Sequence, residues 1–139
     1  MADFQISYKK SLKNEGLYAD LPYDNGKETY MGVSRRANPT WRGWNIIDRY
    51  KKKDLSKEIF VKSLGEDKKL QQLVEDLYKM NYWNVIRGNE IKHQAIADSI
   101  FDSAVNMGCV QAIKLSQRSL YMSKATGIMD DATLSKLNA

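Results

Sequence analysis

The fold is decided by the stretch from Asn14 to Ser34, which reads NEGLYADLPYDNGKETYMGVS. Turn formers interrupt it at Gly16, Pro22, Asp24-Asn25-Gly26 and Gly32, so the stretch does not keep a helical period. Asn-Gly is a strong signal for a two-residue hairpin turn. We therefore expect short, irregular strands at 18–22 and 28–34, on the two sides of this turn.

The segment before this stretch is predicted to be an amphipathic helix. Phe4, Tyr8 and Leu12 recur every four residues, which places them on one face of a helix. Asp3 is suited to be the N-cap, and Gly16 stands where a helix C-cap is expected. Glu15 is then expected in the last turn, at the rim of the cleft that the helix borders.

The rest of the chain is predicted to be helical. Trp41, Trp44 and Ile47 are spaced for a helix that runs to about Lys51, and Asp54 is suited to cap the next one. Residues 63–67 have the character of a connector. Further helices are expected at 67–84, 91–105, 110–119 and 132–137. The fold class is therefore mainly α, with a small β-hairpin near the N-terminus.

Composition indicates one compact, basic protein. Its 139 residues include 22 Lys and Arg against 17 Asp and Glu, which gives a net charge of +5. This charge favours anionic partners such as nucleic acid, an anionic membrane or an acidic cell-wall polymer. The one basic run, Lys51-Lys52-Lys53, is interpreted as a solvated helix end. No nucleic-acid-binding motif is present, so nucleic acid is not an expected partner.

Several kinds of chemistry lack the residues that they need. Cys109 is the only cysteine and His93 the only histidine, so neither a zinc site nor a Cys–His or Ser–His centre is expected. We expect no metal and no cofactor. No signal peptide and no apolar run long enough for a membrane span are visible. If the substrate lies outside the cytoplasm, we expect a protein that is made in the cytoplasm and acts at the cell wall or in the periplasm, which it reaches through a holin or another export route.

The 14–34 stretch holds a set of groups suited to the hydrolysis of a glycosidic bond. This reaction needs a protonated carboxylic acid for the leaving oxygen, and a second group for water or for the sugar. Glu15 lies near Leu12 and Leu17, and such apolar neighbours keep an acid protonated. Asp24, on a polar turn, is expected to stay ionised, and Thr29 to hold a water molecule. The alternative is a solvated carboxylate at a helix end and an ordinary turn.

The ungapped stretch from Glu15 to Val33 resembles the signature of the glycoside hydrolase family 108 N-acetylmuramidases, which are phage and bacterial lysozymes. The matching residues are Glu15-Gly16, Tyr18, Pro22, Asp24, Gly26, Thr29, Gly32 and Val33. The resemblance implies a lysozyme-like helical domain in which Glu15 is the catalytic acid. It also implies a bacteriolytic, endolysin-type enzyme that acts on peptidoglycan as a monomer, without membrane insertion.

The resemblance continues into the second half of the chain. Residues 78–83 look like the family's Tyr-x-x-x-Tyr-Trp stretch, and residues 101–108 and 126–134 look like its type 3 peptidoglycan-binding region. This implies a catalytic part at 1–88 and a helical, peptidoglycan-binding part at 89–139 packed on it.

Four further residues are expected to contact the substrate: Tyr18, Tyr82, Trp83 and Asn106. The aromatic rings could stack on sugars, and core packing is an equal alternative for Tyr82 and Trp83 and the favoured one for Trp41 and Trp44. Asn106 lies one helical turn from Asp102, where a polar network that joins helices is favoured over a substrate contact.

Two other functions remain open at this point. A lytic transglycosylase would cleave the same bond without water and leave an anhydro ring, so it needs no water-positioning Asp24 and Thr29. A non-catalytic module for wall binding or for assisting secretion would bind peptidoglycan without releasing fragments.

Overall fold

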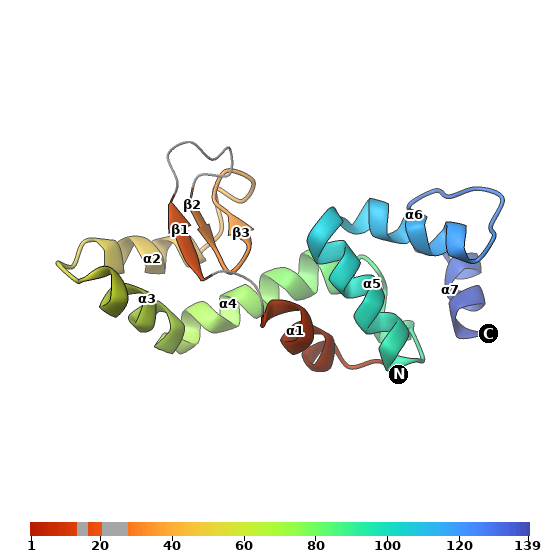
Figure 1. Ribbon diagram of the computed structural model, residues 1–139, viewed down its shortest axis with the longest axis horizontal. Helices are drawn as coiled ribbons and strands as arrows, with labels where there is room; N and C mark the ends of the chain where they lie inside the picture. Colours follow the sequence, from red (N-terminus) through yellow and green to blue (C-terminus); the bar gives the residue numbers. More distant parts are fainter. Residues whose placement is uncertain (14–16, 21–27) are drawn as a thin grey trace. The chain divides into compact units, whose positions relative to one another are not determined.

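The computed structural model describes residues 1–13, 17–20 and 28–139, and its chain divides into two compact units (Figure 1). Unit 1 comprises Met1–Lys13 and Leu77–Ala139, and unit 2 comprises Asn14–Asp76. The mainly α fold class is confirmed. These units are defined by contacts between residues. The expected division into a catalytic part at 1–88 and a peptidoglycan-binding part at 89–139 is a division by function, and it stays a prediction. In the described ranges no helix is both long and apolar enough to cross a membrane.

Unit 2 contains a three-stranded antiparallel sheet with the order β1-β2-β3. The strands are β1 (Tyr18–Asp20), β2 (Glu28–Tyr30) and β3 (Val33–Ser34). In the register, Tyr18 lies opposite Tyr30, Ala19 opposite Thr29, and Asp20 opposite Glu28. The expected strand at 28–34 is in fact two strands, since Met31 and Gly32 have positive φ angles of 47° and 83° and form a tight turn.

Three helices accompany the sheet in unit 2: α2 (Gly43–Lys51), α3 (Lys57–Glu66) and α4 (Lys68–Tyr78), whose last two residues belong to unit 1. Two expectations are wrong here. The cap of α3 is Ser56, which accepts a hydrogen bond from Ile59 N, and not Asp54. Residues 63–66 continue α3 instead of forming a connector, because Phe60 and the buried Leu64 extend the apolar face by a turn.

Unit 1 is helical and has an aromatic core. Its elements are α1 (Phe4–Leu12), a π-helix η1 (Lys79–Trp83), a short 3-10 helix η2 (Gly88–Glu90), α5 (Gln94–Met107), α6 (Cys109–Ser119) and α7 (Asp131–Asn138). Helix α5 packs against α1, η1 and α6. Asp3 caps α1 as expected, with its carboxylate 2.8 Å from Gln5 N. The ring of Phe4 lies 5.3 Å from Tyr8, 5.6 Å from Trp83 and 5.9 Å from Phe101.

Gly88 is required by its close approach to Trp83. A Cβ atom at Gly88 would lie 2.3 Å from the indole ring, which is itself completely buried. We expect Gly88→Ala to lower the free energy of unfolding by about 1–3 kcal/mol, because the core must move to admit one carbon. Urea denaturation measures this, with Gly65→Ala as the control, since a Cβ there has nothing within 4 Å. A Gly88→Ala protein as stable as wild type would contradict the packing described.

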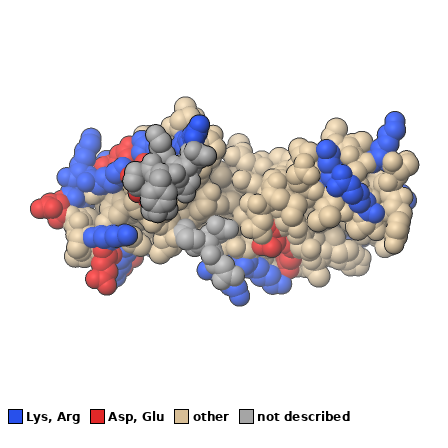
Figure 2. Space-filling view, turned by 45° about the horizontal axis from the view of Figure 1, so that its top comes forward, with Lys and Arg blue, Asp and Glu red and all other residues tan. Residues whose placement is uncertain are grey.

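Charged side chains are spread over the surface of both units. Figure 2 shows Lys and Arg side chains on the part that carries α2 and α3 as well as on the part that carries the C-terminal helices. The acidic side chains visible in this view are fewer. Any site for an anion must therefore be identified from local geometry and not from the net charge.

Candidate functional site

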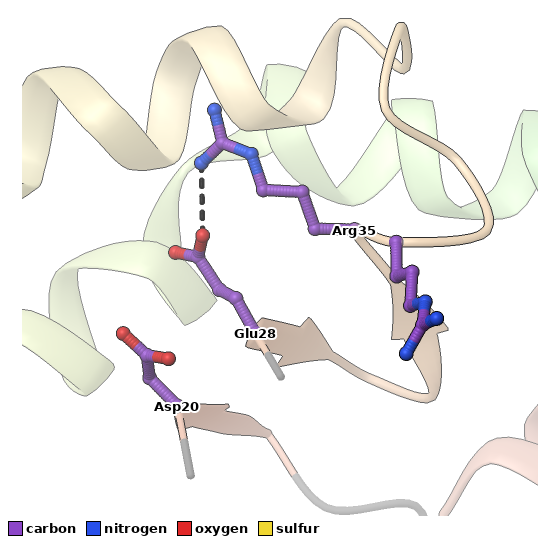
Figure 3. A pocket seen from close by; sticks show the side chains of 4 residues that line it. Asp20, Glu28 and Arg35 are labelled. Atoms are coloured by element: carbon purple, nitrogen blue, oxygen red, sulfur yellow. Dashed lines mark hydrogen bonds and ion pairs between the residues drawn. The ribbon is translucent and has the colours of Figure 1, made fainter. Parts of the chain in front are cut away.

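A pocket of about 560 Å³ opens beside the sheet of unit 2. The described residues that line it are Asp20, Glu28, Arg35 and Arg36. Asp20 ends β1 and Glu28 begins β2, and their register brings them opposite each other. In Figure 3 the carboxylates of Asp20 and Glu28 point to the same side of the sheet, and Glu28 meets the guanidinium of Arg35.

Glu28 lies at the centre of a hydrogen-bond network in this pocket. Although only 7% of the residue is exposed, its carboxylate accepts hydrogen bonds from three side chains, which come from β1, from the segment after β3 and from α2. Tyr18 Oη lies 2.8 Å from Oε2, Arg35 Nη1 lies 2.8 Å from Oε1, and Lys51 Nζ lies 3.1 Å from Oε2. Because Lys51 belongs to α2, these bonds tie the sheet to that helix.

Arg35 connects this carboxylate to a second one. Its two terminal nitrogens bind the two oxygens of Asp48 side by side, at 2.7 and 2.8 Å. Such bidentate pairs are stronger and more directional than single ion pairs. The Arg35 side chain is 34% exposed, so solvent weakens the pair, but the geometry still fixes the segment after β3 against α2.

The electrostatics keep Glu28 ionised. Burial by itself would raise the pKa of Glu28, but hydrogen bonds from Tyr18, Arg35 and Lys51 outweigh burial and place the pKa below its ordinary value. Burial, followed by the bond to Glu28, raises the pKa of Tyr18. Glu28 is therefore unsuited to donate a proton near neutral pH.

The lowered pKa of Glu28 predicts a loss of stability in acid. Because the folded-state pKa lies below the ordinary value of 4.5, the contribution is fully present above about that pH and disappears as the pH falls through the folded-state value. We expect Glu28→Gln to be less stable than wild type at neutral pH, and the gap to close in acid. Urea unfolding at a series of pH values measures this. Glu66→Gln, at an exposed position, is the control, and a constant gap down to low pH would contradict the network.

Thr29 occupies the middle of β2, between two residues that face the helices. Alternation along a strand puts its side chain on the sheet face opposite to Glu28 and Tyr30, which are both buried. Thr29 is half-buried, and its neighbours across the sheet are Ala19 and Ser34. The Thr29 hydroxyl thus lies on a strand that is fixed to α2 through the bonds of Glu28 on its opposite face.

Two of the three expected catalytic residues, Glu15 and Asp24, lie outside the described residues. The set formed by Glu15, Asp24 and Thr29 therefore stays a prediction. Every described carboxyl group with a shifted pKa has it lowered, namely Glu28, Asp48, Glu90, Asp98 and Asp130. These five are poor candidates for an acid that must stay protonated.

The other expected contact residues differ in their surroundings. Tyr18 is half-buried, its hydroxyl is used by Glu28, and its ring meets Phe60 edge-on at 5.0 Å. Tyr82 is half-buried and stacks on Tyr78 at 5.3 Å. Asn106 is exposed and donates to Asp102 at 3.3 Å, but both residues lie on α5, so this bond joins no second helix and the network between helices stays a prediction.

Trp83 requires a correction. It is completely buried, and its indole N–H donates to Asn89 Oδ1 at 2.9 Å. Its ring packs against Phe4, Phe101 and Gly88. No face of the ring is open to a sugar, so Trp83 serves the core.

Glu28 and Arg35 were not predicted as site residues from the sequence. One signal was available, because the strand alternation that buries Tyr30 also places Glu28 on the buried face, and a buried carboxylate needs cationic partners. Among the residues that the structure describes, no group of three or more His, Cys, Asp and Glu could hold a metal ion.

Comparisons with known proteins add a family and a related structure. The family model for glycosyl hydrolase 108 matches residues 8–108, a range that contains all seven expected site residues. A solved structure of SagA from Brucella abortus is similar to this chain, with a TM-score of 0.66 and 25% sequence identity. The similarity covers 96% of this chain and 67% of that one. No curated protein matches the chain.

Proposed function

Because the chain belongs to glycosyl hydrolase family 108, we propose that it is an N-acetylmuramidase. Membership makes it a glycoside hydrolase with peptidoglycan as its substrate class. The bond cleaved in this proposal is the β-1,4 bond between N-acetylmuramic acid and N-acetylglucosamine. The single observation that carries the proposal is the family match over residues 8–108, which span the motif of Glu15, Asp24 and Thr29.

In the proposed mechanism, Glu15 donates a proton to the glycosidic oxygen. Asp24 and Thr29 position water for attack on the sugar, or Asp24 stabilises the positive charge that develops on it. Two findings support this division of roles. The described carboxyl groups with shifted pKa values are held ionised, and Thr29 sits on a strand that the Glu28 network fixes to α2.

Peptidoglycan lies outside the cytoplasmic membrane, so this activity places the site of action at the cell wall. We expect the protein to act there as a monomer. A wall-binding role for residues 89–139 and the route by which the protein reaches the wall remain predictions.

The test is the identity of the sugar at the new reducing end. Purified peptidoglycan is digested with the protein, the products are reduced with borohydride, and the reduced sugar is identified by mass spectrometry. Reduced muramic acid is the expected result. Reduced glucosamine would show that the other bond of the glycan is cut, and anhydro ends that resist reduction would show a lytic transglycosylase. Binding without any soluble fragment would leave a non-catalytic module.

A further inference from the structure

The basic run at the end of α2 contributes to a pocket that the catalytic proposal does not use. A pocket of about 320 Å³ is lined by Tyr50, Lys51, Lys53, Leu55, Lys57 and Phe60, and we call it the lysine pocket. A smaller pocket of about 200 Å³ shares Tyr50 and Lys53 with it and adds Arg49 and Asp67. All of these residues lie in unit 2. The run lies exposed at the helix end, as predicted, and two of its lysines, Lys51 and Lys53, also line the lysine pocket.

The floor of the lysine pocket is apolar and held in place. Tyr50 donates its hydroxyl to Asp67 at 2.9 Å, which fixes the ring. Phe60 is buried and packs edge-on against Tyr18, and Leu55 is half-buried between α2 and α3. A ligand that enters this pocket therefore meets a preformed apolar surface, and little ordering is needed.

The rim of the lysine pocket is cationic. The side chains of Lys51, Lys53 and Lys57 are exposed, and the ammonium of Lys53 lies 4.8 Å from the centre of the Tyr50 ring. Lys51 also binds Glu28 at 3.1 Å. The described lining includes no carboxylate, so the pocket has an excess of positive charge. Lys57 begins α3, where the helix dipole disfavours a cation, so its position adds nothing to helix stability.

We propose that the lysine pocket binds the acidic peptide stem of peptidoglycan, an inference that rests on the proposed function. The stem is a short peptide attached to muramic acid, and it combines free carboxylates with small aliphatic side chains. Ammonium groups at the rim match the carboxylates, and the floor of Tyr50, Leu55 and Phe60 matches the aliphatic groups. Neutral sugar rings offer no carboxylate to the ammonium groups of Lys53 and Lys57, which is why the peptide is the better occupant.

The lysine pocket adjoins the sheet that carries Thr29. Lys51 bonds to Glu28, the residue before Thr29, and Phe60 contacts Tyr18 on β1. β1 is an edge strand of the sheet in the described ranges. Because the Thr29 side chain lies on the opposite face of the sheet from Glu28, a stem would reach the pocket from a glycan beside Thr29 by passing around the β1 edge. Occupation of the pocket would strengthen binding of peptide-bearing strands.

The test compares two substrates and two double variants of the full chain. The substrates are peptidoglycan glycan strands with their stems, and the same strands after an amidase has removed the stems. The pocket variant is Lys53→Gln/Lys57→Gln, and the matched control is Lys62→Gln/Lys69→Gln, which removes two exposed lysines of the same unit outside the pocket. We expect the pocket variant to raise KM for the stem-bearing strands about 3- to 10-fold, with kcat unchanged. On stem-free strands, both variants should match wild type.

A second measurement is independent of hydrolysis. A soluble muropeptide that carries the stem is titrated into wild type and both variants, and binding is followed by the NMR shifts of the backbone amides. The proposal expects shifts at residues 50–60 in wild type and the control, and weaker binding in the pocket variant. It is overturned if wild type shows no shifts there, or if the pocket variant loses activity equally on both substrates. If wild type binds the muropeptide but cleaves neither substrate, the catalytic proposal fails while the peptide site stands.

Discussion

Glu15→Gln is expected to reduce the rate of peptidoglycan cleavage about 10²- to 10⁴-fold, the range typical of a lost general acid. The amide keeps the size and most of the hydrogen bonds of the carboxyl group but has no proton to give to the leaving oxygen. Binding to the wall should be unaffected, so the loss should appear in kcat and not in KM. Turbidity assays on purified peptidoglycan, followed over a range of substrate concentrations, measure both quantities.

The control for Glu15→Gln is Glu66→Gln, an equivalent change at an exposed carboxylate of α3. Circular dichroism shows whether each variant is folded. Cleavage by a folded Glu15→Gln protein at the rate of wild type would remove Glu15 from the mechanism. The described carboxylates with lowered pKa values are poor substitutes, so such a result would also require an acid from elsewhere in the chain.

Trp83→Ala is expected to have the largest effect on stability, a decrease of about 3–5 kcal/mol in the free energy of unfolding. The indole is completely buried, lies 5.6 Å from Phe4 and 5.9 Å from Phe101, and satisfies its N–H through Asn89. Removing it leaves a large cavity and an unused amide oxygen. This loss is a large share of the 5–15 kcal/mol by which proteins of this size are stable.

Tyr82→Ala is the matched comparison for Trp83→Ala, because the neighbouring ring stacks on Tyr78 but is only half-buried. Its cost should be smaller, about 1–2 kcal/mol. Urea denaturation with tyrosine fluorescence or circular dichroism gives both values. If Trp83→Ala unfolded at the same urea concentration as wild type but failed to bind glycan, the core role assigned to Trp83 would be wrong.

Much of the helical fold was predictable because its signals are local. The spacing of Phe4, Tyr8 and Leu12 predicted α1, and Asp3 was identified as its cap, which the structure confirms. Short side chains that accept a hydrogen bond from a nearby backbone N–H act within three residues, so the sequence alone shows them. The β-leaning run near the N-terminus was equally recognisable.

The errors arose where tertiary packing overrides local preference. Gly65 suggested a connector, but Leu64 is completely buried and holds α3 in helical form past it. For Trp83, a glycan contact and core packing were equal alternatives, because helical spacing does not show which other side chains will cover a ring. The turn at Met31-Gly32 was missed since Met is an unusual residue at positive φ.

The candidate site was predictable only in part. The motif identified Thr29, whose place in β2 the structure now describes, and the family match covers that motif. The anchoring network was not predictable, because Glu28, Arg35 and Lys51 are separated by up to 23 positions and meet only when the sheet packs on α2. An ion pair between residues far apart in the sequence produces no periodic pattern from which a single sequence could predict it.

The measurement that tests the central claim most directly is digestion of peptidoglycan in water enriched in heavy oxygen. A muramidase transfers one oxygen atom of water to each new reducing end, so each muramic acid released should carry one heavy oxygen by mass spectrometry. Products without the heavy atom, ending in an anhydro ring, would contradict hydrolysis and the roles given to Asp24 and Thr29.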